Sequence, residues 1–94
     1  MGTRGPADDK TAVEATLRAI LRDVLGLSEA RAAALDDTSP LFGAIPELDS
    51  MAVASLFGEI EERFGIRIDD DEVDLELLAR FGTLATFVAG KTLR

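Results

Sequence analysis

The chain has 94 residues, the size of one small domain, and contains neither Cys nor His. Disulfides, thiolate or imidazole catalysis and structural zinc sites built from these ligands are therefore excluded. Eighteen acidic and ten basic residues give a net charge of −8, which disfavours nucleic acid and anionic membrane surfaces as partners. The composition favours a binding, carrying or scaffolding protein over an enzyme.

Apolar residues make up 47% of the chain, and much of this share is Ala and Leu, which favours helices over strands. The uninterrupted apolar runs are too short for a membrane span. The first residues lack the apolar core of a secretory signal. We therefore expect a cytoplasmic protein with an all-α fold, and nothing in the sequence suggests more than a monomer.

The N-terminal residues 1–9 are rich in Gly, Pro and Asp, which predicts a flexible tail before a single domain over 10–94. A first helix is expected over about 10–25, because apolar residues follow one another there at helical spacing. Gly26 is expected to end this helix. The candidate N-terminal caps are Thr11 in a capping box with Glu14, or Asp8 or Asp9.

A long connection over residues 27–48 follows the first helix. Ser28 is expected to cap a short turn over 29–35, after which Asp, Ser and Pro residues predict a loop. Long ordered loops often lie beside functional sites, so this connection marks a region of interest. Three apolar side chains are expected to fix the loop to the core: Leu41, Phe42 and Ile45.

Residues 50–64 form the clearest helical pattern, and Gly65 is expected to end it. With 100° per residue, the two faces of this helix differ sharply in character. The inward face carries Val53, Leu56, Phe57, Ile60 and Phe64, and the opposite face carries Met51, Ser55, Gly58 and Glu62.

The C-terminal third predicts two further helices. A short third helix is expected over about 72–81, capped by the acidic residues 69–71 and ended by Gly82, and Thr83 is expected to cap a fourth. The inward side chains would be Val73, Leu77, Leu78 and Phe81 in one helix and Leu84, Phe87 and Val88 in the next. The predicted architecture is a small four-helix bundle with a long loop between its first two helices and a short third helix.

The negative charge is concentrated in residues 47–76, which hold eleven acidic and two basic residues. Within them, the run Asp69–Asp74 does not fit a calcium-binding loop, because Val73 and Asp74 occupy its fifth and sixth positions. Acidic residues at the positive end of a helix dipole explain this run, and no metal site is expected.

The tripeptide Asp49-Ser50-Met51 opens the clearest helix, and Asp49 or Ser50 is a plain N-cap on one interpretation. On another, Ser50 presents its hydroxyl where backbone N–H groups and the helix dipole favour an anion. A phosphoester on Ser50 would then be stabilised by about 0.3–1 kcal/mol from the dipole. The neighbouring Asp49 carboxylate opposes this unless it points away or contacts a metal in a modifying enzyme.

The run Leu48-Asp49-Ser50-Met51 resembles the Asp-Ser-Leu/Met signature of acyl carrier proteins. The apolar spacing after Ser50, the run Glu61-Glu62-Arg63-Phe64-Gly65-Ile66 and the opening Leu25-Gly26-Leu27 extend the resemblance over about residues 10–92. It implies an acyl-carrier-like fold with 4′-phosphopantetheine on Ser50, and Asp49 would help the transferase at this site.

The resemblance also implies partners and chemistry. A phosphopantetheinyl transferase would modify Ser50 with Mg²⁺ and coenzyme A. The thiol of the arm would then carry acyl groups as thioesters for acyl-activating ligases, acyltransferases or synthases of fatty-acid-like or specialised lipid or secondary metabolism. The carrier itself would not be an enzyme. Two alternatives are an aminoacyl (peptidyl) carrier and an unmodified interaction module with the same fold.

The sequence departs from the family pattern near the serine. Glu47 stands where the family often has Gly, and Ala52 and Ser55 stand where fatty-acid carriers have acidic residues that dock basic partners. We therefore expect partners that dock more through apolar contacts. The expected partner-binding residues are Met51, Ala54, Ser55, Gly58, Glu59 and Glu62.

Overall fold

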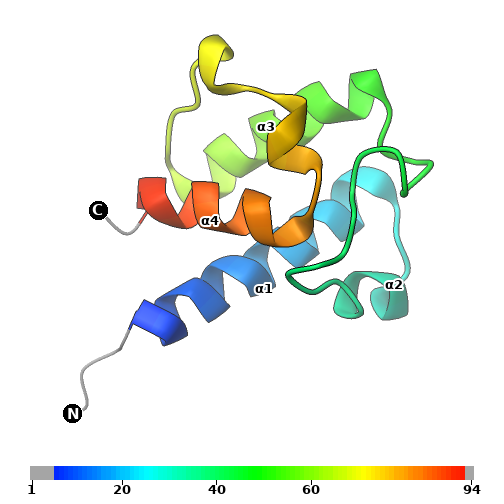
Figure 1. Ribbon diagram of the computed structural model, residues 1–94, viewed down its shortest axis with the longest axis horizontal. Helices are drawn as coiled ribbons and strands as arrows, with labels where there is room; N and C mark the ends of the chain where they lie inside the picture. The colour runs from blue at the N-terminus through cyan, green and yellow to red at the C-terminus, as the bar shows by residue number, and fades with distance from the viewer. Residues whose placement is uncertain (1–5, 93–94) are drawn as a thin grey trace.

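The computed structural model describes residues 6–92, and its regular elements there are helical (Figure 1). In chain order they are α1 (Pro6–Leu25), α2 (Glu29–Ala33), α3 (Ser50–Phe64), the 3₁₀ turns η1 (Asp70–Glu72) and η2 (Leu75–Leu78), and α4 (Phe81–Thr92). The all-α prediction is confirmed. No helix within residues 6–92 is long and apolar enough to cross a membrane.

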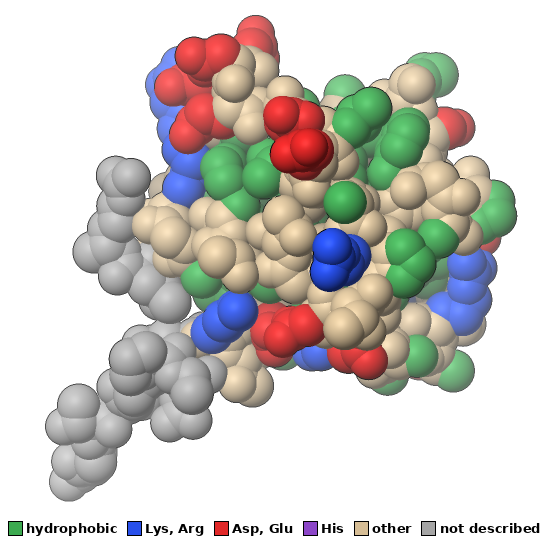
Figure 2. Space-filling view, in the orientation of Figure 1, with side chains coloured by type: hydrophobic (Ala, Val, Ile, Leu, Met, Phe, Trp, Pro, Cys, Tyr) green, Lys and Arg blue, Asp and Glu red, His purple; other side chains and the backbone are tan. Residues whose placement is uncertain are grey.

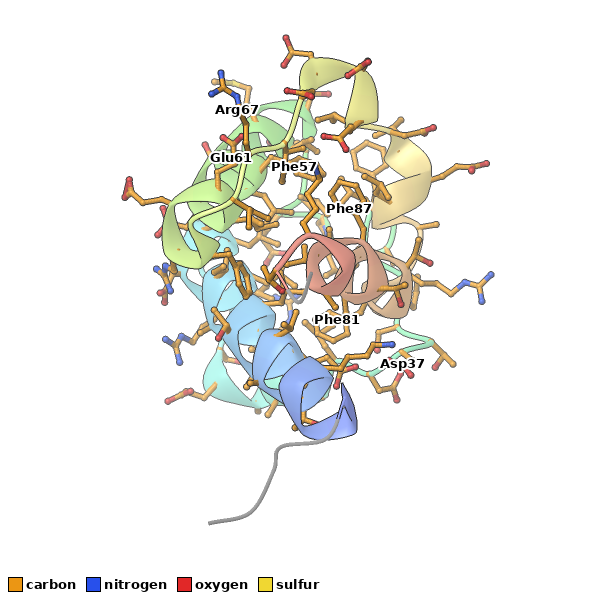
Figure 3. All side chains as sticks on the ribbon, turned by 90° about the vertical axis from the view of Figure 1, so that its left-hand side faces the viewer. Asp37, Phe57, Glu61, Arg67, Phe81 and Phe87 are labelled. Atoms are coloured by element: carbon orange, nitrogen blue, oxygen red, sulfur yellow. The ribbon has the colours of Figure 1, made fainter. Side chains whose placement is uncertain are left out.

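The core lies where α1 packs against α2, α3 and α4, and η2 closes the end beside α4. In Figure 3, Phe57 and Phe87 point inward from α3 and α4, and Phe81 lies between α4 and α1. Arg18 of α1 lies 5.0 Å from the ring centre of Phe81 and donates to the carbonyl oxygen of Leu35 at 2.9 Å. The fully buried large side chains are Leu17, Ile20, Leu21, Leu41, Leu56, Ile60, Leu78, Phe81, Leu84 and Val88.

The first helix begins earlier than its apolar pattern predicts. It starts at Pro6, and proline suits a first helical position because that position needs no N–H donor. Thr11 and Glu14 therefore lie inside α1, and the predicted capping box is wrong. The tail prediction is also wrong for residues 6–9, which are helical, whereas residues 1–5 lie outside the described residues.

The predicted end of α1 is confirmed. Gly26 has a φ of 71°, and the Leu27 N–H donates to the carbonyl oxygen of Arg22 at 3.0 Å. This backbone reversal turns the buried Leu27 side chain back onto the helix. The cap of α2 is confirmed as well, because the Ser28 hydroxyl accepts from the Arg31 N–H at 3.1 Å.

The long loop after α2 is fixed to the core by two of the three expected residues. Leu41 and Ile45 are buried, but Phe42 is 37% exposed, so its inward placement is wrong. The chain turns here: the Leu41 carbonyl oxygen accepts from the Ala44 and Ile45 N–H groups at 3.1 and 2.9 Å, and the Phe42 N–H donates to the carbonyl oxygen of Leu78 at 2.9 Å. Leu41 and Ile45, at the two ends of this turn, are buried, and Phe42 lies within the turn between them, where connecting segments face the surface.

The expected short third helix is present as the two turns η1 and η2 and not as one α-helix over 72–81. Acidic side chains bond locally here: the Asp74 carboxylate accepts from the Glu76 N–H at 3.0 Å, and Glu72 accepts from the Asp69 N–H at 2.9 Å. Such bonds compete with a continuous helical ladder. Val73, extended between the two turns, is 39% exposed and not inward as predicted.

The last helix begins at Phe81, so Gly82 does not end a helix and Thr83 does not cap one, contrary to prediction. The loop after α2 supplies the caps instead. The carbonyl oxygens of Ser39 and Asp37 accept from the N–H groups of Phe81 and Gly82 at 2.8 and 3.0 Å. Backbone from about forty residues upstream thus satisfies the free N–H groups that every helix start presents.

The approach of loop to helix predicts a cost for any side chain at Gly82. A Cβ at this position would lie 2.7 Å from the backbone oxygen of Asp37, so loop or helix must shift. We expect Gly82→Ala to lower the free energy of unfolding by about 1–3 kcal/mol, as overpacking does. Urea denaturation followed by circular dichroism measures this difference.

Gly58→Ala is the matched control, because a Cβ there meets nothing within 4 Å. Since Ala suits a helix interior better than Gly, this variant should gain about 0.5–1 kcal/mol. A Gly82→Ala protein as stable as Gly58→Ala would contradict the close approach.

Candidate functional site

Ser50 is the first residue of α3, and its side chain lies exposed at the helix N-terminus. Of the two candidate caps, Asp49 is the one the structure uses: its Oδ1 accepts from the Ala52 N–H at 2.8 Å. The Asp49 carboxylate is therefore directed at the helix backbone. The Ser50 hydroxyl is placed where the helix dipole favours a negative group.

Two kinds of contact fix the segment before Ser50: burial of Leu48 and an ion pair at Glu47. Leu48 is buried, and its N–H donates to the carbonyl oxygen of Ile45 at 3.0 Å. The Glu47 carboxylate accepts two hydrogen bonds from the Arg31 guanidinium, at 2.8 and 3.2 Å. This pairing lowers the pKa of Glu47, chiefly through the side-chain hydrogen bonds from Arg31. The sequence pattern did not point to Arg31, which comes from α2.

The predicted inward face of α3 is confirmed: Leu56, Phe57 and Ile60 are buried, and Val53 and Phe64 are half-buried against the core. On the outward side, Met51 is 83% exposed, and Ala54, Ser55, Gly58 and Glu62 are exposed as well. Glu59 differs from the other expected partner residues, because it is half-buried and accepts from Arg63 at 2.7 Å.

Surface character changes across the face seen in Figure 2. Acidic side chains gather over η1 and η2, and hydrophobic side chains gather toward the N-terminal end of α3. The exposed large apolar residues of the described chain are Phe42, Met51, Val73 and Leu75. Met51, the residue after Ser50, is the most exposed of these four, at 83%.

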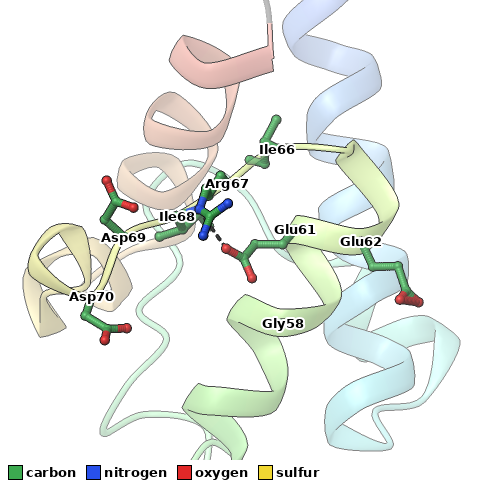
Figure 4. A pocket seen from close by; sticks show the side chains of 8 residues that line it. All are labelled: Gly58, Glu61, Glu62, Ile66, Arg67, Ile68, Asp69 and Asp70. Atoms are coloured by element: carbon green, nitrogen blue, oxygen red, sulfur yellow. Dashed lines mark hydrogen bonds between the residues drawn. The ribbon is translucent and has the colours of Figure 1, made fainter.

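A cleft opens directly beside Ser50, between α3 and the segment that follows it. Its volume is about 440 Å³, and it is lined by Ser50, Val53, Ala54, Phe57, Gly58, Glu61, Ile68, Asp70 and Val73. A second hollow of about 690 Å³ adjoins it toward the C-terminal end of α3 and shares four of these residues: Gly58, Glu61, Ile68 and Asp70 (Figure 4). The walls are mostly apolar near Ser50 and acidic farther away.

One wall of this cleft is the segment of residues 66–73, which we call the strap. Glu61 of α3 accepts from the Ile68 N–H at 2.7 Å, as Figure 4 shows. Lys91 of α4 donates to the carbonyl oxygen of Arg67 at 3.0 Å and to Glu72 at 2.8 Å. No local sequence pattern indicates either role, since these contacts join residues 7, 19 and 24 positions apart.

The arrangement suits attachment of a phosphate-bearing group. An exposed hydroxyl stands at a helix N-terminus, the neighbouring carboxylate is occupied as a cap, and a cleft with apolar walls begins at the same residue. The Glu72 and Asp74 carboxylates accept from nearby backbone N–H groups, and within residues 6–92 no group of three or more Asp or Glu side chains is arranged to hold a metal ion.

Comparison with known proteins agrees with this chemistry. Residues 15–89 match the sequence model of the family described as a phosphopantetheine attachment site. The fold is similar to the solution NMR structure of a holo acyl carrier protein from Nitrosomonas europaea, with 46% sequence identity and a TM-score of 0.76. That similarity covers 83% of this chain and 92% of the other. A search of curated proteins gives no match.

The family match spans most of the chain, including α3 and the cleft beside Ser50. The exposed serine and the cleft fit a tethered prosthetic group. The chain thus belongs to the acyl carrier protein family and is a non-enzymatic carrier whose prosthetic group is covalently attached 4′-phosphopantetheine.

Proposed function

We propose that Ser50 is the attachment residue and that the thiol of its arm carries acyl intermediates, as thioesters, between partner enzymes. These partners belong to fatty-acid-like or specialised lipid or secondary metabolism. The observation that carries the proposal is the exposed Ser50 hydroxyl at the start of α3, beside a cleft that Ser50 itself lines. The prosthetic group supplies the reactive thiol, which a chain without Cys cannot supply.

The chain's own residues position and stabilise the attachment. The first turn of α3 favours the phosphodiester through its dipole, by about 0.3–1 kcal/mol. Asp49 holds that turn in place through its bond to the Ala52 N–H. A tether also keeps the acyl group at a high effective concentration for each partner that docks.

The attachment residue is tested by intact mass after incubation with coenzyme A, Mg²⁺ and a broad-specificity phosphopantetheinyl transferase. We expect one phosphopantetheine on the wild-type protein and none on Ser50→Ala. Ser55→Ala, which removes another exposed serine of α3, should still be modified once. Modification of Ser50→Ala would place the attachment elsewhere, and an unmodified wild type with every transferase would favour an interaction module.

A separate role toward the transferase is proposed for Asp49, beyond its role as a cap. Because Asn caps a helix about as well as Asp, Asp49→Asn should keep the wild-type free energy of unfolding, whereas Asp49→Ala should lose about 1 kcal/mol. We expect both variants to be loaded more slowly than wild type in the same mass assay. Normal loading of Asp49→Asn would reduce Asp49 to a cap.

The outward face of α3 is proposed as the partner-binding surface, comprising Met51, Ala54, Ser55, Gly58, Glu59 and Glu62. Five of these six residues are exposed, and the apolar Met51, one residue after the proposed attachment serine, is 83% exposed. Burial of an exposed thioether by a partner is favourable, whereas burial of an unpaired carboxylate is costly. The proposed partners therefore dock through apolar contacts near Ser50.

Met51→Glu tests this docking mode. We expect kcat/KM for phosphopantetheinylation to fall roughly tenfold, which corresponds to about 1.4 kcal/mol of lost partner binding. Ala12→Glu is the matched control, because it adds the same charge at an exposed site on α1. An unchanged kcat/KM for Met51→Glu would contradict apolar docking at this residue.

A further inference from the structure

The two walls of the cleft beside Ser50 are held very differently. The α3 wall is fixed by fully buried Leu56 and Ile60. Arg63 also ties it to α1 through a 2.8 Å ion pair with Asp23. In the strap, by contrast, Ile68 is the one buried side chain. The strap therefore depends on polar contacts for its position to a degree that α3 does not.

Lys91, in the last turn of α4, makes the contacts that tie the strap to α4, whereas Glu61 ties it to α3. Its ammonium group bonds to the Arg67 carbonyl oxygen at the start of the strap and to Glu72 in η1, and its side chain is only 20% exposed. Glu72 Oε1 also accepts from the Asp69 N–H at 2.9 Å. One lysine thus fixes two points of the strap, and the Glu61 bond to the Ile68 N–H lies between them.

The residues that face Ser50 across the cleft belong to this strap. Ile68, Asp70 and Val73 line the cleft together with Ser50, Val53 and Phe57. A group tethered to Ser50 begins inside this cleft and needs no partner to bring it there. Apolar atoms of such a group gain contacts with both walls only while the strap stays against α3.

We propose that Lys91 is a positioning residue for the Ser50 site. By holding the strap in place, Lys91 keeps it as the second wall of the cleft for the prosthetic arm and its acyl group. Lys91 lines neither the cleft nor the attachment point, and it acts through Arg67 and Glu72. The inference rests on the proposed function, since it takes Ser50 as the attachment residue. It assigns a role to α4 in the environment of the cargo.

The test uses the full chain loaded with a phosphopantetheine arm that ends in a solvatochromic aminonaphthalimide in place of an acyl group. In the wild-type protein the emission of this probe should be blue-shifted from that of the free probe in buffer. Lys91→Met should lose more than half of this shift. Lys91→Arg, which keeps a cation of similar reach, should restore it. Lys10→Met is the control. Lys10 of α1 also bonds to α4, through Thr86 at 3.3 Å, but it does not bond to the strap.

Amide hydrogen exchange on the same proteins separates this role from a general loss of stability. In Lys91→Met, exchange at Ile68, Asp69 and Val73 should be faster, because local opening of the strap is easier, while exchange at Leu56 and Ile60 should not change. Faster strap exchange with unchanged probe emission would overturn the proposal. So would unchanged exchange, or a wild-type emission equal to that of the free probe.

Mass spectrometry of the loaded wild type distinguishes failure of the proposed attachment at Ser50 from failure of the proposed role of Lys91. A wild-type protein that gains no arm overturns the proposed function and the role of Lys91 with it. A protein that gains the arm on Ser50, but whose probe emission is the same in Lys91→Met, overturns the role of Lys91 alone.

Discussion

The short backbone pairing between the loop after α2 and the start of α4 is the constraint on which the rest of the structure depends. The carbonyl oxygens of Ser39 and Asp37 cap α4, and the Phe42 N–H bonds to the Leu78 carbonyl oxygen in return. These bonds satisfy polar backbone groups of two segments that would otherwise compete with water for partners. They fix one long loop and one helix start in a single step.

The segment between this pairing and Ser50 is fixed to the core along its length. Leu41, Ile45 and Leu48 are buried in turn, so the loop stays on the core up to the residue before Asp49. Asp49 then leaves in an extended conformation and caps α3, which makes Ser50 the first helical residue. As the first residue of α3, Ser50 is exposed and lines the cleft between α3 and the strap.

The parts of this structure that local chemistry decides could be predicted from the sequence. The bounds of α3, its buried face and the left-handed glycine at its end agree with prediction, because each depends on residues within a few positions of one another. The candidate serine stood out for the same reason. The start of α4 was mispredicted because its caps, at Asp37 and Ser39, lie about forty residues upstream.

The cleft shows the same limit. Val53 and Phe57 could be placed on one face of α3 from spacing alone, but the opposite wall depends on Lys91 and Glu61, which meet the strap only in the folded chain. The division of residues 70–78 into two turns also escaped prediction. Acidic side chains there bond to nearby N–H groups and so compete with a continuous helix. The spacing of the apolar residues Val73, Leu77 and Leu78 does not indicate that competition.

The two walls of the cleft beside Ser50 are stabilised by different kinds of contact, and this difference has a consequence for how other proteins recognise the carrier. The position of α3 is fixed by buried side chains, whereas that of the strap depends chiefly on polar bonds. If a bound acyl group forces a rearrangement of the cleft, we therefore expect the strap to move before α3 does. If the outward surface of α3 binds partners as proposed, it would then keep one shape in the empty and the loaded molecule. An enzyme that binds this surface would recognise the carrier whatever group it carries, and discrimination between acyl groups would depend on the strap and the arm.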